Sequence, residues 1–515
     1  HESFPMIRRL LVTLLGLLLL SGGFVFSWIQ DPNRFKPELA NLIEEQAGAP
    51  VEINGDLAWR LFPPLSLTAK SITANVDGVA WSAGYLALDL DVLTIIQTRD
   101  VDRWRIESLT LRDVTVTDDS GVLDMRSLTV SNFAMGTAAP VTASLIYTPL
   151  DAEPIPLELT ALVAYQSSPA LISIADANFS STVAAGVCNL EATTASLPKA
   201  EEPGAEEPKP EDLIPVEVWR SYDWQGQCDF EHLTGADYRF EGATVVLTNI
   251  DGAGENVLRL PEFFGGSATV TLAIDARREP IMWKFTPDLQ NVDNQRLMEW
   301  LDQRLQWVAP LAYAGTLELE GNTTDELVAS LSGETSFDAG KGAISIGMIK
   351  QPLLAIATLL QEPEKISSWP DVWNYERLVG NWRVDKQHHI VELALDNLTV
   401  VADGDYDAAT DDLDMLAELT FKTLPEGTMF EVNPLLMDLP IPVRCRGALE
   451  SPNCRVDEKA AQRLVASMLT SREGSAMREK LNQKIEEKVP EEYRDAARSI
   501  LDLLGDVLED RENRD

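Results

Sequence analysis

Apolar and polar residues alternate along most of the chain between residues 50 and 455. The segment 84–95 shows the pattern clearly, because leucines at every second position are separated by Ala87 and Asp89. Side chains of a strand point alternately to two faces, so this spacing predicts strands with one apolar face and one polar face. Such strands are typical of antiparallel sheets that are solvated on one side.

Four segments carry this pattern over their full length: 84–95, 155–165, 268–275 and 413–421. In each segment, the apolar residues are spaced so that they share one face of a strand. The residues that we expect on this face are Leu86, Leu88, Leu90 and Val92; Leu157, Leu159 and Val163; Val270, Leu272 and Ile274; and Met415, Leu419 and Phe421. The pattern alone is compatible with a closed barrel, a sandwich of two sheets or an open trough.

Turn-forming residues separate the predicted strands. Asn54-Gly55 predicts a turn, and Pro63-Pro64 follows a few residues later. Because proline has no backbone N–H to donate to a neighbouring strand, we expect Pro63-Pro64 to end one strand and to direct the chain into the next.

The N-terminal residues differ from the rest of the chain. Arg8 and Arg9 precede an uncharged, mostly apolar run over 10–29. About 20 apolar residues span a bilayer as a helix, and the two arginines favour a cytoplasmic side for residues 1–9. A cleaved signal peptide is the alternative, but its apolar region is usually shorter. We therefore expect a single-pass transmembrane helix, with the rest of the chain outside the cytoplasm.

The overall charge restricts the partners. The 515 residues carry 82 acidic and 42 basic side chains, a net charge of −40, which argues against nucleic-acid binding. The four histidines include one pair, His388-His389, whose members would point to opposite faces of a strand and lie at the surface. The sequence has no phosphate-binding glycine loop and no C-x-x-C pair. We expect a protein without enzymatic activity, metal or cofactor.

The four cysteines suit an oxidising compartment. They are Cys188, Cys228, Cys445 and Cys454, and three pairings are possible. We favour Cys188 with Cys228, across a linker, and Cys445 with Cys454, across a length suited to a hairpin. Four free thiols are the alternative.

Two further segments break the strand pattern. Residues 196–213 are rich in Pro, Glu and Ala, which predicts a linker. Residues 456–515 carry helix formers and frequent charge, which predicts a helical tail. The expected domains are therefore two β domains at 30–195 and 214–455, separated by the linker and followed by the tail. We also expect short helices near 31–48 and 348–361, where apolar residues recur at helical spacing.

The segment 31–74 resembles the N-terminal signature of the AsmA family of bacterial envelope proteins. The matching elements, in order, are Asp31-Pro32, Gly48, Val51, Ile53, Gly55, Trp59 and Pro63-Pro64. Residues 235–277, with Phe264-Gly265-Gly266, are similar to a later module of that family. Residues 337–360 and 439–457 also follow its C-terminal part.

The resemblance implies a mainly β protein with an elongated antiparallel sheet that is folded into an apolar trough. It implies an inner-membrane anchor, a periplasmic body and a role in outer-membrane biogenesis. Members are related to TamB-like bridge-type proteins that move glycerophospholipids, and other envelope proteins could complete a bridge to the outer membrane. The alternative is a non-catalytic scaffold for the assembly of outer-membrane proteins.

Overall fold

The computed structural model describes residues 32–37, 40–41, 50–60, 65–76, 79–91, 105–118, 121–150, 152–167, 169–194, 212–235, 238–301, 307–347, 349–350, 353–354, 363–423, 430–432, 436–449 and 451–456. The chain forms two compact units. The first contains His1–Pro198 and Ser221–Asp251, and the second contains Lys199–Arg220 and Gly252–Asp515.

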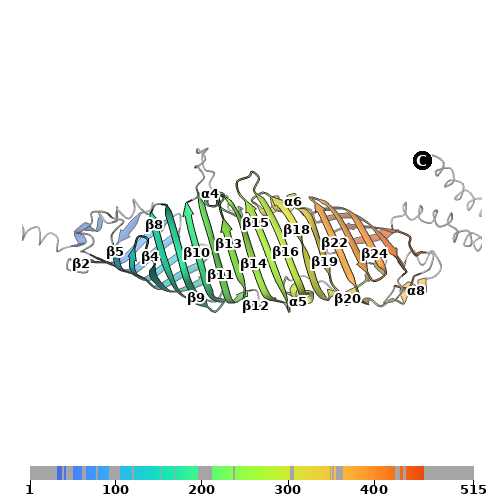
Figure 1. Ribbon diagram of the computed structural model, residues 1–515, viewed down its shortest axis with the longest axis horizontal. Coiled ribbons are helices and arrows are strands. Elements are labelled where there is room, and N and C mark those ends of the chain that lie inside the picture. The colour runs from blue at the N-terminus through green and yellow to red at the C-terminus, as the bar shows by residue number, and fades with distance from the viewer. Residues whose placement is uncertain are drawn as a thin grey trace, which may run out of the picture. The chain divides into compact units, whose positions relative to one another are not determined.

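The first unit is an antiparallel sheet in which nearly every strand pairs with the strand before it in the chain (Figure 1). A short 3-10 helix, η1 (Pro32–Phe35), precedes the strands. The strands are β1 (Val51–Ile53), β2 (Leu57–Arg60), β3 (Leu65–Val76), β4 (Val79–Leu90), β5 (Arg105–Asp118), β6 (Gly121–Ala134), β7 (Ala139–Pro149), β8 (Ile155–Ser167), β9 (Ala170–Ser181), β10 (Ala184–Thr194), β11 (Tyr222–Gly235), β12 (Tyr238–Glu241) and β13 (Thr244–Asn249).

The first strands correct one turn prediction and agree with another. β1 and β2 both pair with β3, and the backbone N–H groups of Asn54 and Gly55 donate to carbonyls of β3. Asn54-Gly55 therefore does not reverse the chain, because it joins β1 to β2 and both strands run in the same direction along β3. A Cβ at Gly55 would lie 2.5 Å from the Lys70 carbonyl oxygen, so this close approach requires glycine. The antiparallel pairing of β2 with β3 agrees with a chain reversal at Pro63-Pro64, which lie outside the described residues.

The second unit contains a further antiparallel meander and a small separate sheet (Figure 1). The meander is β14 (Ala253–Phe263), β15 (Gly266–Asp275), β16 (Met282–Asp293), β18 (Pro310–Glu320), β19 (Ser332–Asp338), β22 (Leu378–Asp385), β23 (His388–Leu395), β24 (Leu398–Asp407), β25 (Asp412–Phe421), β26 (Ile441–Gly447) and β27 (Asn453–Val456). The small sheet is β17 (Trp307–Val308), β20 (Gly342–Ser345) and β21 (Val372–Tyr375).

Short helices of the second unit connect strands. They are α4 (Val216–Ser221), α5 (Asn294–Trp300), α6 (Thr324–Ser330) and α8 (Pro363–Ser367). Side chains satisfy the first N–H groups of two of these helices. Asp293 accepts from two backbone N–H groups of α5, and Thr323 forms a capping box with Glu326 at α6.

The mainly β, antiparallel architecture is confirmed. β11–β13 follow the predicted linker in the chain, and β11 pairs with β10, so they complete the sheet of the first unit. The predicted transmembrane helix at 10–29, most of the linker and the helical tail from 457 lie outside the described residues. In the part of the chain that the structure describes, no helix is long and apolar enough to span a membrane.

Candidate functional site: the apolar face of the sheet

Opposed residues of paired strands share a face, so the strand registers show which apolar side chains lie in line. One line crosses the first unit from β3 to β11 without a polar residue. Its members, each opposite the next, are Ala69, Leu86, Leu111, Leu128, Ala143, Leu159, Phe179, Gly186 and Phe230. A second line beside it contains Leu67, Leu88, Leu109, Val130, Val141 and Ala161. We call this surface the open apolar face.

The large side chains of the open apolar face are half-buried. Leu86, Leu128, Leu159 and Phe179 all retain contact with solvent. The apolar residues of this unit that are fully buried are mostly alanines, and the larger ones are Leu57, Val114 and Phe240. In the described part of the first unit, the open apolar face therefore has no packed core above it.

A glycine and a disulfide continue this surface over β10 and β11. At Gly186 an added Cβ would meet the backbone of β11, and the rings of Phe179 and Phe230 contact each other across it at 5.5 Å between centroids. Cys188 lies directly opposite Cys228, two residues further along the same face, and the two form a disulfide. This pairing was predicted and is confirmed.

A β-bulge at Asp176 keeps the face continuous where the sequence does not alternate. Asp176 has φ of 49°, and the register of β9 shifts on both sides at this point. The Asn189 side chain accepts a hydrogen bond of 2.9 Å from the Asp176 N–H, so the backbone N–H of the inserted residue has a partner. Ile174 and Ala177 therefore share a face although they are three residues apart.

In the second unit, the apolar face is open only in part. Leu272, Phe285 and Leu317 are opposed and half-buried. Ile274 and Trp283 lie one row further and are buried. Residues of α4, of α6 and of the chain before α4 cover them, and Trp219 of α4 is one of these residues.

At one end of β23–β26 the same face is covered by other parts of the chain. We call Leu395, Leu398, Leu419, Phe421 and Ile441 the covered end, because each is at most 4% exposed. The small sheet, α8 and residues 430–432 and 436–437 supply the cover, with Trp369, Trp373 and Phe430 at its centre. Phe430 stacks on Trp373 with centroids 3.9 Å apart. Asn397 fixes the Phe430 backbone, since its Oδ1 accepts from the N–H at 2.7 Å and its Nδ2 donates to the carbonyl at 3.2 Å.

The residues that were predicted on the apolar face of the strands fall into three groups. Those that lie half-buried on the apolar faces are Leu86, Leu88, Leu90, Leu157, Leu159, Val163, Val270, Leu272 and Met415. Those that are buried are Ile274, Leu419 and Phe421. Val92 lies outside the described residues. Cys445 lies opposite Cys454 and forms the second predicted disulfide, which is confirmed.

The two adjacent histidines lie on opposite faces, as the alternation predicts. His388 is exposed on the polar face, with its Nδ1 3.1 Å from a carboxylate oxygen of Asp405. His389 is half-buried on the apolar face. Trp382 donates from its indole nitrogen to His389 Nδ1 at 3.1 Å, so the neutral ring carries its proton on Nε2. Burial lowers the pKa of His389.

The polar face of the second unit contains an open hollow of about 1130 Å³. Its lining includes Glu318, Glu334, Arg383, Asp385 and His388. Among the described residues, no group of His, Cys, Asp and Glu side chains is arranged to hold a metal ion.

These features define a class of protein in which a long antiparallel meander presents one apolar face that is only partly covered. The model of the AsmA family matches residues 6–146, which confirms the resemblance over the N-terminal part of the chain. No curated protein and no solved structure matches the sequence.

Proposed function

We propose that the open apolar face binds the acyl chains of glycerophospholipids and that the protein, without catalysing a reaction, supports outer-membrane biogenesis by conducting them. The observation that carries the proposal is the line from Ala69 to Phe230, which no polar residue interrupts and whose leucine and phenylalanine side chains are half-buried. Acyl chains require no specific polar partner, only continuous apolar surface.

The energetics favour such a ligand. Moving one CH₂ group of a tail from water onto an apolar surface contributes about 0.8 kcal/mol. The line crosses β3 to β11, and with about 4.8 Å between neighbouring strands it extends over roughly 38 Å. One leaflet of a bilayer core is about 15 Å thick, so a tail covers only part of the line and can occupy successive positions along it.

The proposed location is the inner membrane, with a single-pass anchor at 10–29 and the rest of the chain in the periplasm. The family match at 6–146 supports a place in the cell envelope. Two disulfides suit an oxidising compartment. Proposed partners are membrane lipids and further envelope proteins, and the net charge of −40 argues against nucleic acid.

Adjacent residues of β8 provide a matched test, because Leu159 lies on the open apolar face and Thr160 is exposed on the polar face. A photoreactive amino acid is placed at each position in the full chain in cells, and bound lipid is identified by mass spectrometry. We expect lipid adducts from position 159 and none from position 160. Leu159→Asp should abolish adducts formed from position 128, whereas Thr160→Asp should leave them unchanged.

The competing function is a scaffold for outer-membrane protein assembly. It would give protein adducts at both positions, or no difference between the two aspartate variants. Either result would overturn the proposal of a lipid-binding face.

A further inference from the structure

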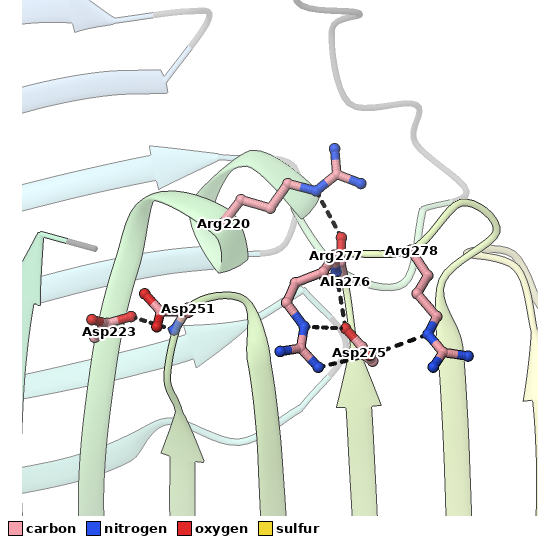
Figure 2. Close-up of polar contacts among 7 residues, drawn as sticks. All are labelled: Arg220, Asp223, Asp251, Asp275, Ala276, Arg277 and Arg278. Atoms are coloured by element: carbon pink, nitrogen blue, oxygen red, sulfur yellow. Dashed lines mark hydrogen bonds and ion pairs between the residues drawn. The ribbon is translucent and has the colours of Figure 1, made fainter. Parts of the chain in front are cut away.

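Three arginines gather at one edge of the second unit's sheet, where β15 turns into β16 and α4 lies beside the turn (Figure 2). They are Arg220 on α4 and Arg277 and Arg278 in the turn. Their side chains are 30%, 54% and 67% exposed. Such a cluster is unusual in a chain with about twice as many acidic as basic residues.

Asp275, the last residue of β15, orients two of the arginines (Figure 2). Arg277 donates to its two carboxylate oxygens at 2.7 and 2.9 Å, and the Arg278 Nε lies 3.4 Å from it. The hydrogen bond from Arg277 is the main reason why the pKa of Asp275 is lowered. The carboxylate therefore stays charged and holds both guanidinium groups at the rim of the sheet.

Arg220 is fixed from the other side. Its Nε donates to the Ala276 carbonyl at 2.7 Å (Figure 2), and its Nη2 lies 3.5 Å from Glu279. The Glu279 side chain is 83% exposed, and an ion pair this exposed contributes little, so an incoming anion can replace it.

The cluster adjoins a buried apolar cluster, and half-buried apolar surface begins one row further along β15. Ile274, next to Asp275 in the chain, packs with Trp283, and Trp219, next to Arg220, packs against them. Leu272, two residues before Ile274, belongs to the half-buried row with Phe285 and Leu317. Cationic groups at the rim of an apolar surface match an amphiphile with an anionic head.

We propose that Arg220, Arg277 and Arg278 bind a phosphate group, carried by a lipid whose tails lie on the apolar face of the second unit. Guanidinium groups form paired hydrogen bonds to phosphate oxygens, which lysines and carboxylates cannot do. The assignment of the phosphate to a lipid rests on the proposed function. Free inorganic phosphate is the other source of the same chemistry.

The test is calorimetric titration of the purified full chain with three probes: dihexanoyl phosphatidic acid, inorganic phosphate and dihexanoylglycerol, which has the same tails without phosphate. We expect phosphatidic acid to bind at least tenfold more tightly than either of the others. Arg278→Glu should weaken phosphatidic acid at least tenfold and leave dihexanoylglycerol unchanged, which also shows that the apolar face is intact.

Arg296→Glu is the matched control. Arg296 is 64% exposed and pairs with Asp293 three residues away, as Arg278 pairs with Asp275, but it lies on α5, outside the cluster. It should leave all three affinities within twofold. Equal affinities of phosphatidic acid and inorganic phosphate, both lost in Arg278→Glu, would keep the phosphate site but overturn its assignment to lipid.

Two other results separate this inference from the proposed function. Unchanged phosphatidic acid binding in both Arg220→Glu and Arg278→Glu would overturn the phosphate site, whether or not position 159 forms lipid adducts. Phosphate binding that depends on these arginines, without any lipid adduct at position 159, would support the site and count against the proposed function.

Discussion

Leu159 and Leu419 both come from strands in which every second residue is apolar, yet only one of them is removed from water. Leu159 lies half-buried on the open apolar face of the first unit, whereas Leu419 is 4% exposed at the covered end of the second. The strands themselves do not differ in pattern. The difference is made by the small sheet, α8 and residues 430–432 and 436–437, which pack over the covered end.

This comparison separates two uses of the same pattern. A face that the chain covers itself contributes to stability through burial and packing. A face that the chain leaves open keeps apolar area in contact with water, which a ligand can then remove. The open apolar face is therefore the better candidate for binding, and the covered end is the better candidate for stability.

The largest expected effect comes from removing an aromatic ring from the covered end. Phe421 is fully buried and contacts Trp369 and Phe430, so Phe421→Ala should lower the free energy of unfolding by about 3–5 kcal/mol. Phe179→Ala removes the same ring from the open apolar face and should cost only about 1 kcal/mol, because Phe179 is half-buried. Urea denaturation of both variants measures the difference. Equal losses would contradict the contrast between the two faces.

The next largest effect is expected from removing the disulfides, and the two should differ in how much they stabilise the protein. They close loops with sequence separations of 40 and 9 residues. The chain-entropy model gives about 4 kcal/mol for the longer loop and about 2.7 kcal/mol for the shorter. Replacing Cys188 and Cys228 by alanine should therefore destabilise the protein more than replacing Cys445 and Cys454. Denaturation of the two double variants without reductant tests the order, and the reverse order would refute the entropic explanation.

Asn397→Ala should loosen the cover without removing apolar surface. The substitution leaves the N–H and the carbonyl of Phe430 without their partner in a buried site, at a cost of about 2–3 kcal/mol. Hydrogen exchange at the Phe430 amide should become faster, while amides of β8 in the first unit should not change. Asn381→Ala, at an exposed position of β22, is the control and should leave the exchange as it is.

The smallest effect is expected on the polar face of β25, near the start of the strand. Hydrogen bonds from Arg444, and then from Arg446, lower the pKa of Asp414 from 3.8 to about 2. Because the side chains of Asp414 and Arg444 are 40% exposed, Asp414→Asn should cost less than about 1 kcal/mol at neutral pH.

The sign of the Asp414 effect follows from its lowered pKa. The ionised carboxylate stabilises the folded state above pH 3.8, and this contribution is lost as the pH falls through about 2. The difference in stability between the wild type and Asp414→Asn should thus be constant down to about pH 3.8 and then disappear. A difference that grows on acidification would be inconsistent with the ion pair.

Much of the sheet could be predicted from residue spacing alone. Leu86 and Leu88, or Leu157 and Leu159, stand at every second position, and the period of a strand places them on one face. Cys445–Cys454 followed from a segment length suited to a hairpin, and Cys188–Cys228 was placed across the predicted linker. The strand faces and the hairpin pair could be predicted because they depend only on local geometry.

The remaining features depend on contacts between distant segments. The bulge at Asp176 has no marker in the sequence, and it decides which face Ile174 occupies. The cover over Phe421 comes from Trp369 and Phe430. In the sequence around these two residues, apolar side chains recur neither at the two-residue spacing of a strand nor at the 3.6-residue spacing of a helix. The half-buried position of His389 depends on Trp382, which belongs to the neighbouring strand.

The order of strands has a consequence for how the sheet is made. From β3 to β11, each strand pairs with the one that precedes it in the chain. Apart from the connections that lead into β5 and β11, each new strand needs only a short loop to reach its partner. Most contacts are therefore local, and local contacts favour fast folding. A chain that emerges from its N-terminus can therefore add strands one at a time, with each finished edge serving as the template for the next.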